Sequence, residues 1–105
     1  MAVEIRDKGP IPLNRPDVKI RGGIDPRTGN VFAVFLDFQA HEAVVWWQAL
    51  GGFLPKQYYG HVNLVDFDAY PHDGHFKVLG HTWRDDGGDV PGDHFIVIDL
   101  GEIPQ

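Results

Sequence analysis

Hydrophobic and polar residues alternate along much of the chain, in short runs that turn sequences separate. Alternation over four to eight residues is typical of a strand with one buried face, and an unbroken apolar run favours a strand buried on both faces. Val18–Ile24 alternates with basic residues, whereas Val31–Leu36 is apolar throughout. Asp25–Asn30, between them, contains the proline and glycine of a tight turn. The pattern predicts a hairpin whose second strand is central in its sheet.

Three further strands are predicted in the second half of the chain, at Tyr58–Phe67, His75–Trp83 and His94–Leu100. In the first of these the alternation slips by one residue between Leu64 and Val65, which indicates either a β-bulge or a strand buried on both faces. In the last, nearly every residue is apolar, so we expect this strand also to lie in the middle of its sheet.

Gln39–Leu50 is predicted to be a helix, because apolar residues recur at spacings of three and four and the pair Gly51 and Gly52 follows as a C-terminal cap. Trp46 and Trp47 are adjacent in it. Neighbouring helical residues lie about 100° apart, so the two indoles cannot share one apolar stripe. We therefore expect either a helix covered on two sides or one exposed tryptophan.

Residues 1–16 contain Pro10, Pro12 and Pro16, which disfavour both helix and central strand. This segment is predicted to be an extended N-terminal arm, either loose or laid on a surface. Residues 17–105 then form one α+β domain in the order β-β-α-β-β-β, with a mostly antiparallel sheet and one helix packed on a face.

Composition and charge limit the classes of function that we expect for this chain. A chain of 105 residues, 43% hydrophobic, is long enough for one domain with its own core. Residues 1–30 carry a net charge of +2 and residues 31–105 a net charge of −8, so the acidic body disfavours nucleic acid as a partner. The sequence shows neither a signal peptide nor an apolar run of about 18 residues, so we expect no membrane contact and a cytoplasmic protein.

Candidate chemistry is sparse. The chain has no cysteine and no serine, which excludes thiolate or serine nucleophiles and cysteine zinc sites. Four histidines form the alternative of a divalent transition-metal site, because imidazoles bind such metals: His72, His75, His81 and His94. An aspartate- and glycine-rich loop is a candidate for Ca²⁺, although its spacing is not that of an EF-hand and we favour a solvated turn: Asp85, Asp86, Asp89 and Asp93.

The strongest positive feature is a concentration of large apolar residues that exceeds what one small helix and sheet can bury. Aromatic residues of this kind anchor protein interfaces. The predicted interface joins these residues to two from the arm: Trp46, Trp47, Phe53, Tyr58, Tyr59, Ile11 and Leu13.

We therefore expect a non-enzymatic protein-binding module of microbial or viral type, with no catalytic residues and no cofactor. It would be either a homo-oligomer that exchanges arms or an acidic, immunity-like inhibitor of a basic protein. The alternative is a small metal- or histidine-dependent enzyme that uses the four histidines.

Overall fold

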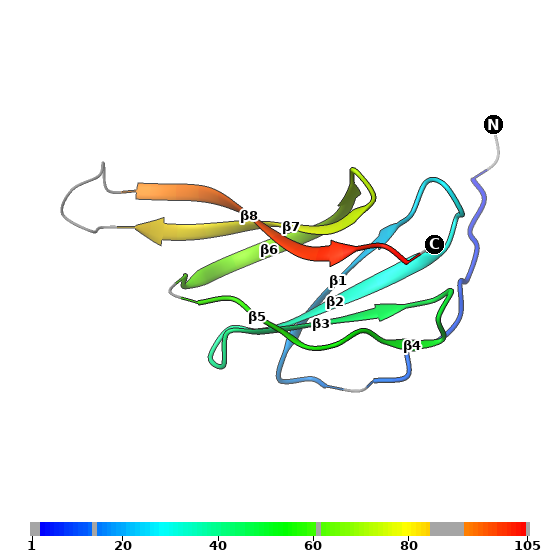
Figure 1. The fold of residues 1–105 in the computed structure, drawn as a ribbon, viewed down its shortest axis with the longest axis horizontal. Coiled ribbons are helices and arrows are strands. Elements are labelled where there is room, and N and C mark those ends of the chain that lie inside the picture. The colour runs from blue at the N-terminus through cyan, green and yellow to red at the C-terminus, as the bar shows by residue number, and fades with distance from the viewer. Residues whose placement is uncertain (1–2, 14, 61, 85–91, 105) are drawn as a thin grey trace.

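The computed structural model of the chain describes residues 3–13, 15–60, 62–84 and 92–104. In these residues it shows strands and turns and no helix, arranged as two antiparallel sheets packed face to face (Figure 1). The bounds of the strands are β1 Lys19–Ile24, β2 Val31–Asp37, β3 Glu42–Trp47, β4 Gly52–Phe53, β5 Gln57–Tyr58, β6 Leu64–His72, β7 His75–Arg84 and β8 Gly92–Glu102. The prediction of an α+β fold was therefore wrong.

The predicted helix is instead strand β3 and the turns on either side of it. Its central residues are valines and tryptophans, which favour strands because β-branched and aromatic side chains pack well on a pleated surface. Gly51, with φ of 70°, closes the turn between β3 and β4, and its N–H donates to the Trp47 carbonyl at 3.0 Å. Of the glycine pair predicted to cap a helix, Gly51 thus lies in the turn of a hairpin and Gly52 begins β4, opposite Trp47.

Sheet A contains β1 to β5. The order is β1-β2-β3-β4, and β5 pairs with the opposite end of β3. The predicted hairpin of β1 and β2 is confirmed, with Lys19 opposite Leu36 and Ile24 opposite Val31. Strand β2 lies between β1 and β3, as its continuous apolar sequence predicted.

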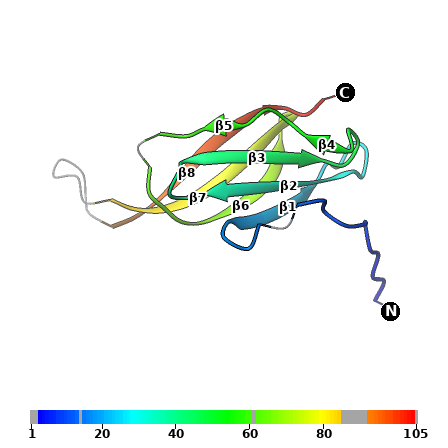
Figure 2. The same cartoon turned by 90° about the horizontal axis from the view of Figure 1, so that it is seen from below.

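Sheet B contains β6, β7 and β8 in that order. The predicted bulge is confirmed, because the pairing of β6 with β7 shifts between Leu64 and Asp66. The prediction of a central position for the last strand was wrong: β7 is central, and β8 is an edge strand. The far ends of β7 and β8 extend past the end of sheet A in both views (Figures 1 and 2).

The hydrophobic core lies between the two sheets. The ring of Phe76 on β7 packs edge-on against Phe32 of β2 and Trp47 of β3, with centroids 5.0 and 5.6 Å apart. At the rim of the sandwich, Arg21 of β1 donates to Asp66 of β6 at 2.8 Å. Aromatic contacts thus join the sheets in the middle, and an ion pair joins them at one edge.

The arm lies across the outer face of sheet A. Leu13 packs on a second apolar cluster formed by Ala33, Phe35 and Trp46, and the side-chain amide of Gln48 donates to the Lys8 carbonyl at 2.9 Å. Figure 2, in which sheet A lies in front of sheet B, shows the arm approaching this sheet. Both faces of sheet A are therefore covered, one by sheet B and the other partly by the arm.

Candidate functional site

The two adjacent tryptophans are buried on opposite faces of β3. Trp47 points into the core between the sheets and is 2% exposed, whereas Trp46 lies under the arm and is 7% exposed. Successive side chains of a strand point to opposite faces, so a strand covered on both sides buries two neighbouring indoles. The excess of apolar residues that the sequence showed is absorbed within the chain at this point.

The other residues of the predicted interface are likewise divided between the core and the surface of the molecule. Tyr59 is buried, its hydroxyl donates to the Asp37 carbonyl at 3.2 Å, and burial together with the Asp37 charge raises its pKa to about 12. Phe53 and Tyr58 are exposed, but they lie on β4 and β5, which pair with opposite ends of β3. Ile11 is also partly exposed, on the arm. Phe53 is nevertheless paired with Trp46, its ring lies 6.3 Å from Phe35, and Ile11 lines the same groove as Trp46. The predicted residues therefore separate into a group on the outer face of sheet A and two, Trp47 and Tyr59, in the core.

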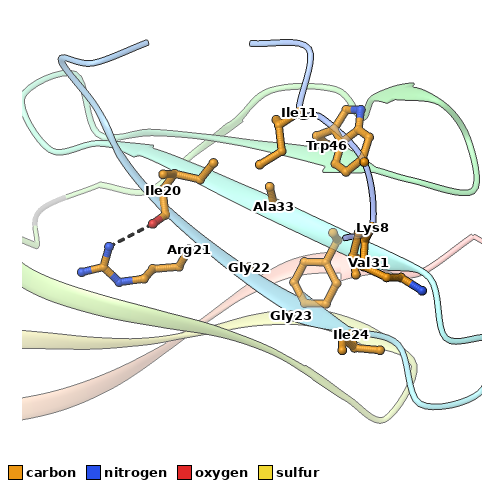
Figure 3. Close-up of a pocket in the computed structure, with 12 residues that line it drawn as sticks. Lys8, Ile11, Ile20, Arg21, Gly22, Gly23, Ile24, Val31, Ala33 and Trp46 are labelled. Atoms are coloured by element: carbon orange, nitrogen blue, oxygen red, sulfur yellow. Dashed lines mark hydrogen bonds between the residues drawn. The ribbon is translucent and has the colours of Figure 1, made fainter. Parts of the chain in front are cut away.

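A groove of about 450 Å³ runs between the arm and the outer face of sheet A (Figure 3). Its walls are apolar, with Ile11 and Trp46 on one side and Ile20 and Ile24 on the other. The small side chain of Ala33 leaves the floor open between them. The arm already fills part of this apolar face.

The histidines proposed as metal ligands pair with carboxylates at separate points. His75 Nδ1 lies 3.0 Å from Asp99, and His81 Nε2 lies 2.5 Å from Asp93. His72 is the last residue of β6 and is paired with His75, and His94 is on β8 opposite Thr82. The part of the chain that the structure describes contains no group of three histidine or carboxylate side chains placed to hold one metal ion.

The two threonine hydroxyls have structural roles. Thr28 donates to the buried carboxylate of Asp25 at 3.1 Å, and Thr82 donates to the Asn63 carbonyl at 2.6 Å. Burial opposes ionisation of Asp25, but donors from Arg27 and Thr28 outweigh it and lower its pKa. Both hydroxyls are thus part of turns and strand packing. The proposed Ca²⁺ ligands Asp85, Asp86 and Asp89 lie outside the described residues.

The outer face of sheet B carries a second concentration of large apolar side chains, which we call the β7–β8 patch. Its members are Leu79 (37% exposed), Trp83 (58%), Phe95 (75%) and Val97 (58%). Leu79 is paired directly with Val97, and Phe95 is paired with His81, two residues before Trp83. Side chains at such opposite and diagonal positions are within contact reach. The four residues therefore form one continuous surface.

Carboxylates surround this patch. Asp68 pairs with Leu79 in the sheet, and Asp93 and Asp99 lie on β8 on either side of Phe95 and Val97. Asp99 accepts the Gly101 N–H, the His75 ring N–H and the Lys77 ammonium, and these donors lower its pKa to about 2. Asp93 has the ring of His81 as its hydrogen-bond partner on the same face of the sheet.

Beside this patch lies an open hollow of about 350 Å³, lined by three apolar residues (Phe67, Leu79 and Phe95), by His81 and by three carboxylates. The carboxylates are Asp66, Asp68 and Asp93. This surface was not predicted from the sequence, because the apolar run His94–Leu100 indicated a strand in the middle of a sheet. Aspartates at both ends of the apolar run, on the same face as Phe95 and Val97, are a sequence signal for an exposed edge strand, because charged residues on edges prevent aggregation.

Comparison with protein-family models, with curated proteins and with solved structures found no match to this chain. No helix long and apolar enough to cross a membrane occurs in the described ranges.

Proposed function

We propose that this chain is a protein-binding module that contacts a basic partner through the β7–β8 patch on the outer face of sheet B. The observation that supports this proposal most strongly is the difference between the two outer faces. The apolar outer face of sheet A is partly covered by the chain's own arm, which buries Trp46, whereas four large apolar side chains of sheet B face outward with no segment of the described chain over them. An exposed apolar patch with a polar rim is typical of an interaction site.

The size of the patch fits a protein partner. An aromatic side chain presents roughly 150–250 Å² and leucine or valine less, so the exposed fractions of the four residues amount to roughly 400 Å². One partner in a standard interface contributes about 800 Å². The surrounding aspartates and neighbouring polar groups supply the remaining area, as the polar rim of an interface does.

The charge around the patch supports a basic partner. Residues 31–105 carry a net charge of −8, and Asp68 and Asp93 border the apolar side chains. Basic groups on a partner would gain from these carboxylates, and their long-range attraction would speed association. The acidic, immunity-like inhibitor is therefore the form of the protein-binding hypothesis that we favour.

The alternative form, a homo-oligomer that exchanges arms, makes a separate prediction. Here the arm packs on its own sheet, through Leu13 and the Gln48 to Lys8 hydrogen bond. Exchange would make the same contacts between two chains and would give a dimer. Light scattering coupled to size exclusion, at micromolar concentration, distinguishes it from the monomer that our proposal expects.

The test is selection of binders from a random-peptide display library on the immobilised chain. We expect the recovered peptides to combine apolar and basic residues, and their affinity to fall as salt rises. Binding of a synthesised hit should weaken at least tenfold with Phe95→Ala and with Trp83→Ala. It should be unchanged with Tyr58→Ala, the matched exposed aromatic on sheet A. Hits whose affinity is insensitive to both patch variants would refute the proposal.

A further inference from the structure

We infer that a partner adds an extended strand to the free edge of β8, and that this strand carries the alternating pattern basic–x–apolar–x–apolar–x–basic. This inference rests on the proposed function, because it specifies how the same surface binds and which peptide class it takes. Strand addition to an exposed sheet edge is a common way of recognising extended peptides.

The first observation is that β8 offers an edge. It pairs with β7 along 11 residues, Gly92–Glu102, and in the described residues no strand pairs with its other side. It forms the rim of sheet B in Figure 1. An edge strand presents a row of backbone N–H and C=O groups that another strand can pair with.

The second observation is that apolar surface continues to this edge on both faces of the strand. Phe95 and Val97 are exposed on the outer face, and Ile96 and Ile98 on the core side are only partly buried. An added strand would cover part of all four side chains. Burial of this surface would add to the backbone hydrogen bonds of the new pair.

The sequence pattern of the partner follows from cross-strand pairing. The outward-facing side chains of β8 run Asp93, Phe95, Val97 and Asp99. Opposite charges and apolar pairs stabilise directly opposed positions, and like charges destabilise them. A strand with two central apolar residues flanked by lysine or arginine, all at alternate positions, therefore complements β8 in either direction.

The same rule disfavours a second copy of this chain as the occupant. Two antiparallel β8 strands that align their apolar residues pair Phe95 with Val97 and place Asp93 opposite Asp99 at both ends. Moving the register by two residues instead places an aspartate opposite Val97 or Phe95. The carboxylates therefore destabilise self-pairing in each of these registers, whereas lysine or arginine side chains of a basic strand would form ion pairs with them.

The probe is a synthetic peptide with the sequence lysine–threonine–valine–threonine–valine–threonine–lysine, and its control has glutamate in place of lysine. Two further versions carry N-methyl groups on the odd or on the even backbone amides. Alternate N–H groups of a strand point to the same edge, so each version blocks one edge only. Fluorescence anisotropy with the full-length chain measures the affinities.

We expect the lysine peptide to bind at least tenfold more tightly than the glutamate control. One N-methylated version should lose binding at least tenfold, and the other should retain it. Loss with both versions, or with neither, would overturn strand addition. Binding that follows this pattern but is insensitive to Phe95→Ala would instead overturn the proposed function, so the two failures are distinguishable. A dimer at neutral pH that Val97→Lys dissociates would show that a second copy is the occupant and would also overturn the inference.

Discussion

Replacement of Phe95 by alanine should leave the stability of the isolated chain almost unchanged, although Phe95 belongs to a β-sheet and to the largest exposed apolar surface of sheet B. Complete burial of a phenylalanine side chain stabilises a fold by about 1.5–3 kcal/mol. Phe95 is 75% exposed, so only a quarter of that burial is at stake. The expected loss is about 0.4–0.8 kcal/mol.

The matched comparison is Phe76→Ala on the neighbouring strand. Phe76 is fully buried and contacts Phe32 and Trp47, so its truncation should cost about 3–5 kcal/mol. Urea denaturation followed by tryptophan fluorescence measures both. With a denaturant slope of about 1–3 kcal/mol per M, Phe76→Ala should lower the midpoint by about 1 M or more. Phe95→Ala should lower it by less than that. If Phe76→Ala does not fold, Phe76→Leu provides the core comparison.

A loss of 2 kcal/mol or more for Phe95→Ala would contradict this expectation. Such a loss would mean that Phe95 is buried in solution. A loss of stability that grows with protein concentration would show that a second copy of the chain covers Phe95. A loss of stability independent of concentration would show that Phe95 is buried within its own chain.

Three other variants test the remaining parts of the structure. Gly23→Ala places a methyl carbon 2.6 Å from the buried Phe32 ring, so we expect the free energy of unfolding to fall by about 1–3 kcal/mol in urea denaturation. An unchanged free energy of unfolding would contradict the packing of β1 on Phe32. Leu13→Ala should destabilise the chain by about 1–2 kcal/mol, and Ile5→Ala, at a site 90% exposed, should not; equal effects would show that the arm is not docked. The pKa of Asp99 is lowered to about 2, so its stabilising contribution is present above about pH 4 and is lost as pH falls toward 2. Asp99→Asn should therefore flatten the fall in melting temperature over that range, and an unchanged acid profile would contradict this assignment.

The strands with clear alternation were predictable from the sequence. The hairpin of β1 and β2 and the bulge near Leu64 follow from turn residues and from a slip in a period-two pattern. The error at Gln39–Leu50 has a physical cause: the five apolar residues in a row from Ala43 to Trp47 satisfy a helical spacing and a doubly buried strand equally well. Only the arm, which is distant in sequence, makes the outer face of β3 a buried environment.

The patch could not be found from the sequence for a related reason. An apolar run such as that of β8 indicates burial on both faces, and the sequence does not contain the order of strands in a sheet. The aspartates on either side of Phe95 and Val97 carry the information that the strand is at an edge, but aspartates are also common at strand ends and in turns. The alternation of β7 predicts that Leu79 and Trp83 share one face of the strand. That Phe95 and Val97 of β8 lie on the same face depends on the pairing of β7 with β8, which the sequence does not give.

Amide chemical-shift mapping of the ¹⁵N-labelled chain tests the assignment of the binding surface most directly. During titration with the lysine-flanked valine peptide, the largest changes should fall on β7 and β8, around Leu79, Trp83, Phe95 and Val97. The residues of the groove under the arm, including Ile11 and Trp46, should not shift. Changes centred on that groove or on β1 to β3, with β8 unaffected, would contradict the account and would place recognition on sheet A.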